Sequence, residues 1–143
     1  MPKGKTHLAW ELGLFPLVLA GGFALGLGME LLPLGLGYLL GSLFLSPDLD
    51  LRYSRPARRW GPLRFLWWPY ARLFRHRGLS HHSFLGPLTR FLYLGLWLLS
   101  LSFLLGFALP PFRLSWALSG LVGLWIPQFL HVFLDRFLAG KRV

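Results

Sequence analysis

The sequence predicts an all-α integral membrane bundle of four transmembrane helices, and three observations support this prediction. The 143 residues are 55% hydrophobic and 14% charged, whereas roughly a quarter of the residues in a soluble domain are charged. The hydrophobic residues gather in four runs. The basic residues gather at both termini and between the second and third runs. A chain of this length is expected to form one domain over residues 1–143.

The four apolar runs define the predicted helices. They cover residues 12–29, 31–46, 91–109 and 114–134. A spanning helix needs about 20 apolar residues, so the third and fourth runs qualify by length, whereas the second is short. The first run is longer than a signal-peptide core and has no small-x-small cleavage site, which favours an uncleaved span.

The connections within each pair of runs are short and contain proline. The first two runs meet at residues 30–33, and the last two meet at residues 109–113. Short connections produce antiparallel helical hairpins. The sequence therefore predicts two hairpins, over residues 7–50 and 84–138, joined by a basic and aromatic segment over residues 51–83.

The placement of the basic residues predicts the orientation of the bundle. Eight of the 15 Lys and Arg residues lie within 51–77, and most of the others lie near the termini. Cytoplasmic segments of membrane proteins carry an excess of Lys and Arg. We therefore expect both termini and the segment 51–83 to be cytoplasmic, in a multi-pass protein of the bacterial inner (plasma) membrane.

Glycines recur at four-residue spacing in the first two runs. Gly22 and Gly26 form one such pair, and Gly37 and Gly41 form another. In membranes this spacing lets the backbones of two helices approach closely. The pattern predicts close helix packing around the first hairpin.

All five histidines and all three aspartates lie at or next to the ends of the apolar runs that this topology places on the cytoplasmic side. They are His7, Asp48, Asp50, His76, His81, His82, His131 and Asp135. Imidazole nitrogen and carboxylate oxygen bind zinc and other divalent first-row metals. Ionisable groups at membrane depth mark functional sites, so the sequence predicts a metal centre.

The number of candidate ligands exceeds the need of one ion. A catalytic zinc typically has three protein ligands and an open position, so one or two ions are expected. The chain has no cysteine, and Glu11 is an additional oxygen donor. Each motif also has a structural explanation, such as a hydrogen-bonded pair for His131 and Asp135, which are four residues apart.

Several of these motifs resemble those of a known family. They are Gly4-Lys5-Thr6-His7, Ser46-Pro47-Asp48-Leu49-Asp50, His76-Arg77-Gly78-Leu79-Ser80-His81, and the pair His131 and Asp135. The chain is similar to the YdjM-type inner-membrane metal-dependent hydrolases, and most similar to a related bacterial group described only as metal-binding proteins. A remoter similarity is to zinc-dependent phospholipase C. The resemblance implies metal binding by His7, Asp48, Asp50, His76, His81, His131 and Asp135. The sequence departs from the YdjM-type pattern at His82, where a serine is usual.

Arginines and aromatic residues alternate in the segment 51–75. Trp and Tyr prefer the membrane interface, Arg reaches toward headgroups, and polybasic stretches attract anionic lipids. The segment is either a clamp over the metal site or a membrane anchor without a substrate role. The candidate lipid or substrate contacts are Arg58, Arg59, Trp67, Trp68 and His82. Nucleic acid binds the same residue types, but it is the weakest of these interpretations.

The predicted function is that of a metal-dependent hydrolase, with zinc as the expected metal. It would act at the cytoplasmic membrane surface on a lipidic or phosphoester substrate. The candidate catalytic residues are Asp50 and Arg77. Asp50 or Asp48 would be the general base, whichever is not a ligand, and Arg77 could stabilise a developing oxyanion. The alternatives are a non-enzymatic membrane protein with a structural metal site and a metal-sensing or anionic-lipid-binding protein.

Overall fold

The computed structural model describes residues 4–74, 78–79, 82–111 and 113–139, and these residues form helices and connections without a strand. The all-α prediction is therefore confirmed for this part of the chain. In chain order the elements are α1 (Gly4–Ala24), η1 (Gly28–Glu30), α2 (Leu31–Leu43), η2 (Pro47–Asp50), α3 (Arg55–Arg59), η3 (Gly61–Leu66), α4 (Trp67–Leu73), α5 (Leu85–Leu105) and α6 (Leu114–Ala139).

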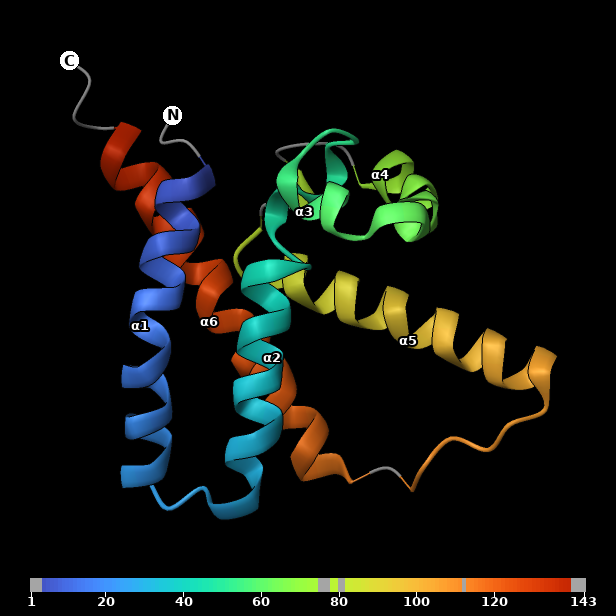
Figure 1. Cartoon of the computed structure of the whole chain (residues 1–143), viewed down its shortest axis with the longest axis horizontal. Coiled ribbons are helices and arrows are strands. Elements are labelled where there is room, and N and C mark those ends of the chain that lie inside the picture. The colour runs from blue at the N-terminus through green and yellow to red at the C-terminus, as the bar shows by residue number, and fades with distance from the viewer. Residues whose placement is uncertain (1–3, 75–77, 80–81, 112, 140–143) are drawn as a thin grey trace.

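Helices α1, α2 and α6 lie side by side and form the main bundle (Figure 1). The most extensive packing is between α2 and α6. Glycine makes this closeness possible, because a Cβ atom at Gly37 would collide with the carbonyl oxygen of Gly120. A Cβ atom at Gly123 would likewise collide with the carbonyl oxygen of Leu34. The two backbones therefore approach each other as small residues allow in membrane helices.

The glycines of the first run have a different role at its end. Gly26 and Gly28 adopt left-handed φ angles of 72° and 55°, which glycine accepts without a Cβ clash. They form the turn between α1 and α2. Gly26 is thus a turn residue rather than a helix-packing residue, whereas Gly41 does pack closely, with its hypothetical Cβ 2.8 Å from Cγ of Pro127.

Helix α5 meets the bundle at its N-terminal part and then diverges from α6 (Figure 1). Near its start, the ring of Phe84 stacks on Trp125 of α6 with 4.5 Å between centroids, and the indole of Trp125 donates to the Phe84 carbonyl. Most of the remaining α5 side chains are exposed and apolar, including Leu98 and Phe103. A large exposed apolar surface marks a site of contact with a membrane or with another protein.

The short helices α3, η3 and α4 fold over the start of α5 (Figure 1). Their core is aromatic: Trp67 packs edge-on against Trp60 and Tyr70, and it also contacts Tyr93 of α5. Two hydrogen bonds attach this layer to α5. The hydroxyl of Tyr93 donates to the Leu66 carbonyl, and the hydroxyls of Tyr70 and Thr89 bond each other. Over residues 51–74, the basic segment is therefore a packed layer and not an extended linker.

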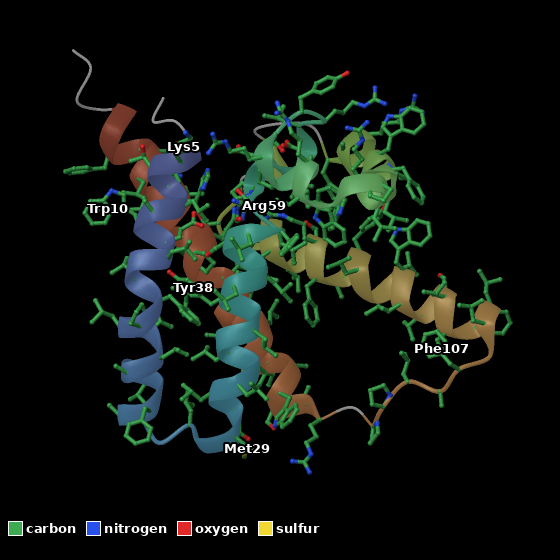
Figure 2. The ribbon with its side chains drawn as sticks, in the orientation of Figure 1. Lys5, Trp10, Met29, Tyr38, Arg59 and Phe107 are labelled. Carbon is green, nitrogen blue, oxygen red and sulfur yellow. The ribbon has the colours of Figure 1, made fainter. Side chains whose placement is uncertain are left out.

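Three of the described helices are long and apolar enough to cross a membrane: Lys5–Ala24, Leu85–Leu105 and Leu114–Phe137. The helix over Gly28–Leu43 is apolar but shorter, so the fourth span stays a prediction. The start of α1, the end of α6 and the layer α3–α4 lie at the same end of the molecule (Figure 1). Figure 2 shows Lys5 and Arg59 toward that end and Met29 at the opposite one.

Candidate metal centre

Side chains from three elements meet at the end of the bundle that carries Lys5 and Arg59. Helix α1 contributes His7 and Glu11, and helix α6 contributes His131 and Asp135. Each of these pairs is separated by four residues, so both members lie on one face of their helix. The turn η2 contributes Asp48. The two histidines and Glu11 are buried. They are polar residues on helices that are otherwise apolar.

The two imidazoles stand parallel between the carboxylates. Their rings stack with 4.3 Å between centroids and 23° between planes. Nε2 of His7 lies 3.2 Å from Oδ1 of Asp135, and Nε2 of His131 lies 3.7 Å from Oδ2 of the same aspartate. Nε2 of His131 also lies 3.9 Å from Oδ2 of Asp48. One ligand atom each from His7, His131 and Asp135 lies within 4.8 Å of the other two.

Glu11 determines how His131 presents its ring. Its Oε1 lies 3.3 Å from Nδ1 of His131. With Glu11 ionised, its carboxylate can only accept, and Nδ1 then carries the hydrogen. The lone pair of the neutral imidazole is then on Nε2, on the side of Asp48 and Asp135. A carboxylate behind a histidine in this way is the usual outer partner of a metal-binding imidazole.

The donor set fits a divalent first-row metal. Two imidazole nitrogens and the oxygens of Asp48 and Asp135 are ligand types that zinc accepts. The separations of 3.7 and 3.9 Å at Nε2 of His131 exceed a hydrogen bond, and they suit ligands that share one ion. The carboxylates of Glu11, Asp48 and Asp135 gather beside the two imidazoles, and a divalent cation would offset their negative charge. In addition, the buried Nδ1 of His7 has no hydrogen-bond partner among the described residues.

A pocket of about 290 Å³ opens beside this cluster, and we refer to it as the metal pocket. Its lining includes the buried His7 and His131 and the half-buried Asp48. It also includes Arg55 and Arg59 of α3, both exposed. Arg59 is held in place because its Nη1 donates to the Leu43 carbonyl at 2.7 Å. The pocket thus combines candidate metal ligands with positive charge at its mouth.

The two aspartates of η2 face different surroundings. Asp48 lines the metal pocket, whereas Asp50 is buried and lines a second pocket below α3, η3 and α4. Successive residues of a 3₁₀ helix turn by about 120°, so positions two apart cannot share a face. The structure does not bring Asp50 into the group of His7, His131 and Asp135.

Arg90 supports this turn from inside the bundle. It is completely buried on α5, and its guanidinium donates to the Leu45 carbonyl, between α2 and η2, and to Oε1 of Gln128 on α6. It is close enough to Asp48 and Asp50 for their charges to interact. Sequence reasoning missed this role. The available signal was an isolated arginine at the edge of an apolar run.

The remaining predicted site residues before α5 are not part of this cluster as the structure describes it. His76, His81 and Arg77 lie outside the described residues, so their roles stay predictions. Nδ1 of His82 accepts from the amides of Phe84 and Leu85, at 3.3 and 3.1 Å, and therefore caps the start of α5.

The residues predicted to contact lipid lie in three places: the metal pocket, the second pocket and the exposed surface. Arg59 lines the metal pocket, and Trp67 and Trp68 line the second pocket. Arg58 is exposed and bonds the Tyr53 carbonyl. Arg55 was absent from the predicted contacts but lines the metal pocket, and it follows Ser54, the N-cap of α3, whose Oγ accepts from Ala57.

The fold and this cluster define a helical protein with a candidate metal centre at one end of an apolar bundle. The chain belongs to the family described as "Uncharacterized metal-binding protein (DUF2227)", which matches residues 2–142. This confirms the resemblance to the metal-binding group. The comparisons support neither the YdjM-type hydrolases nor phospholipase C.

One relative is an "Uncharacterized protein" of Aquifex aeolicus (strain VF5), 56% identical over 63 residues. The match covers 44% of this chain and 45% of the relative, so the chain matches less than half the length of that protein. No solved structure matches the chain.

Proposed function

We propose that this protein is a metal-dependent membrane hydrolase that acts on a lipidic or phosphoester substrate at the cytoplasmic surface. The observation that carries the proposal is the metal pocket itself. Candidate ligands and the arginines Arg55 and Arg59 line the same cavity of about 290 Å³. A structural metal needs a closed set of ligands and no adjoining cavity, whereas a catalytic one keeps an open position.

Each residue has a role in this proposal. His7, His131 and Asp135 would hold the metal, and zinc is the metal that best suits these donors. When bound, the metal would supply Lewis acidity for hydrolysis. Glu11 would hold the ring of His131 in its metal-binding tautomer. Asp48, which is half-buried and lines the pocket, would be the general base.

The arginines at the mouth would bind the anionic part of the substrate. Arg55 and Arg59 are exposed and face the pocket, and arginine pairs well with phosphate oxygens. The start of α1 and the end of α6 lie at the same end of the bundle, which would be the membrane surface in the proposed topology. Anionic lipids there would meet the arginines of segment 51–83.

The test uses the full chain in detergent, loaded with zinc, and a screen of phosphodiesters and short-chain phospholipids. We expect turnover above that of free zinc. Arg55→Gln should retain the metal but lower kcat/KM about tenfold, because one charge-assisted bond to the substrate is lost. Arg58→Gln is the matched control on the same helix. Absence of turnover throughout the screen would contradict the hydrolase proposal.

A structural metal is the second candidate, and one observation favours it. The candidate ligands come from α1, η2 and α6, so one ion would pin three separate elements together. In that case, removal of zinc should lower the unfolding temperature strongly, and Arg55→Gln should change nothing. Zinc loss with an unchanged unfolding temperature would exclude this candidate.

A further inference from the structure

A second pocket is lined by residues of η2 and of the layer of short helices, and we call it the aromatic pocket. Its volume is about 210 Å³, which is below the usual size of pockets for drug-sized ligands. Among the described residues, none lines both this pocket and the metal pocket. Its charged and aromatic lining residues are Asp50, Arg52, Tyr53, Arg64, Phe65, Trp67 and Trp68. The aromatic pocket is therefore a separate site with room for a small group.

The charge balance of the aromatic pocket is positive. Arg52 and Arg64 line it, and Asp50 is the only acidic residue among its described lining residues. The Asp50 carboxylate also interacts with the buried Arg90, so it offsets at most one of the two guanidinium charges on the pocket. Residues 51–83 contain no Asp or Glu, and the layer itself therefore supplies no acidic partner. This balance favours an anion as the ligand.

The ring of Trp68 holds two guanidinium groups at this pocket. The guanidinium of Arg52 lies 5.0 Å from the centroid of the ring, and that of Arg72 lies 4.7 Å from it. Stacking on tryptophan limits the motion of an exposed arginine and leaves the N–H groups at its edge able to bind phosphate oxygens. Two like charges on one ring also repel each other, and an anion bound beside them would reduce this repulsion. The arginines are therefore ordered before a ligand binds, which favours binding.

Exposed apolar side chains share the layer with these arginines. Tyr53 and Phe65 line the aromatic pocket and are 77% and 61% exposed. Leu63 of η3 and Leu73 of α4 are exposed as well. Arginine beside exposed aromatic and aliphatic side chains is typical of a membrane interface, where the guanidinium reaches the headgroups and the apolar residues enter the leaflet. The surroundings of the pocket therefore favour a lipid phosphate over a free one.

We propose that the aromatic pocket binds the phosphate of an anionic phospholipid and thereby anchors the layer of short helices to the membrane surface. The phosphate would lie against the guanidinium groups of Arg52 and Arg64. The acyl chains would pass over the exposed rings of Tyr53 and Phe65. Inorganic phosphate carries the same charged group but has no part that the apolar side chains could contact, so it would bind less tightly. The proposal does not rest on the hydrolase proposal, because the lipid is bound and not cleaved in this pocket.

The experiment is calorimetric titration of the full chain in a non-ionic detergent with three probes: dihexanoyl phosphatidylglycerol, dihexanoyl phosphatidylcholine and inorganic phosphate. The glycerol lipid is anionic, whereas the choline lipid has the same phosphate and chains but no net charge. We expect the glycerol lipid to bind about tenfold more tightly than either of the other probes. Equal affinity of the two lipids would overturn the preference for an anion. Inorganic phosphate that binds as tightly as the glycerol lipid would overturn the assignment to a lipid.

Two variants test the arginines of the pocket. Arg52→Gln and Arg64→Gln change exposed side chains, so the fold should be retained. Each should weaken binding of the glycerol lipid about tenfold, because one charge-assisted contact with the phosphate is lost. Arg113→Gln is the matched control, since Arg113 is also exposed and stacks on a tryptophan, Trp116, at 5.7 Å from the ring centroid. An equal loss in the control, or no loss in either pocket variant, would refute the proposal.

A further variant separates the aromatic pocket from the metal pocket. Arg55 lines the metal pocket and not the aromatic one, so Arg55→Gln should leave the affinity for the glycerol lipid unchanged. A loss of affinity in Arg55→Gln without a loss in Arg64→Gln would place the lipid in the metal pocket and contradict a separate site. The titrations measure binding and not turnover. A protein without hydrolytic activity can therefore still bind the lipid, and failure of one proposal is distinguishable from failure of the other.

Discussion

Oε1 of Glu11 lies 3.3 Å from Nδ1 of His131, across the contact between α1 and α6. Both side chains are buried, and the hydroxyl of Tyr38 donates to the Glu11 carbonyl at 2.6 Å, which ties this part of α1 to α2. In Figure 2, Tyr38 lies between the two helices. The orientation of the candidate metal ligand His131 therefore depends on the packing of three helices, and not on α6 alone.

Replacement of Glu11 should weaken metal binding without removing a ligand. Glu11→Ala leaves Nδ1 of His131 without its acceptor, so we expect about 10- to 100-fold lower zinc affinity. Glu11→Gln, whose amide oxygen can still accept, should lose less. Competition with a chromophoric chelator measures the affinity. Glu30→Ala, which changes the other glutamate of the chain, is the control, and an equal loss there would refute the role assigned to Glu11.

Metal content should follow the cluster that the structure forms. His7→Ala, His131→Ala and Asp135→Asn each remove a candidate ligand, so each should lower zinc bound per chain in the purified protein. His82→Ala should retain zinc, because the ring of His82 caps α5. Elemental analysis after zinc reconstitution measures this. If His82→Ala loses as much zinc as His131→Ala, or if the unsubstituted protein holds none, the proposed cluster is wrong.

The metal should leave the protein as the pH falls. Imidazole binds metal only as the neutral ring and carboxylate binds as the anion, so protons compete with the ion at every ligand. Zinc affinity should therefore be higher above pH 7 and should decrease steadily toward pH 5. Equilibrium dialysis at several pH values tests the direction. An affinity that rises on acidification would be inconsistent with a site made of His and Asp.

Arg90 should be a strong contributor to stability. Arg90→Leu leaves the Leu45 carbonyl and Gln128 without their buried donor and removes the positive charge near Asp48 and Asp50. Loss of one member of a buried charged network costs about 3–5 kcal/mol. Thermal unfolding in detergent should show a large decrease in Tm. Arg113→Leu, at an exposed position, should change Tm little, and a similar loss in both variants would indicate a general effect of charge.

The topology can be tested because the chain has no cysteine. Tyr53 and Pro111 are both exposed, and the predicted topology places them on opposite sides of the membrane. Single cysteines at these two positions therefore test it. Under the four-span proposal, Pro111→Cys reacts with an impermeant reagent in intact cells, whereas Tyr53→Cys reacts only after lysis. Reaction of both residues in intact cells would rule out four spans with a cytoplasmic segment 51–83.

Helical periodicity and residue type were sufficient to predict much of the candidate metal cluster from the sequence. His131 and Asp135 share a face because they are four residues apart, and the same spacing relates His7 and Glu11. Hydrophobic length was sufficient for α5 and α6. The sequence pattern did not predict the role of Gly26. This residue has the small-xxx-small spacing of a helix-packing glycine but forms a turn, and spacing does not reveal whether a residue has a left-handed φ angle.

The sequence by itself determined that the chain is helical and apolar, and that its histidines and aspartates gather at helix ends. These properties follow from local composition and from the period of a helix. Only the tertiary structure decided that Asp48 and Asp50 line different pockets, that Glu11 meets His131, and that Arg90 is buried beneath both aspartates. Such contacts join residues far apart in the chain, and they depend on the rotation and closeness of packed helices, which here follow from glycines at the contact of α2 with α6.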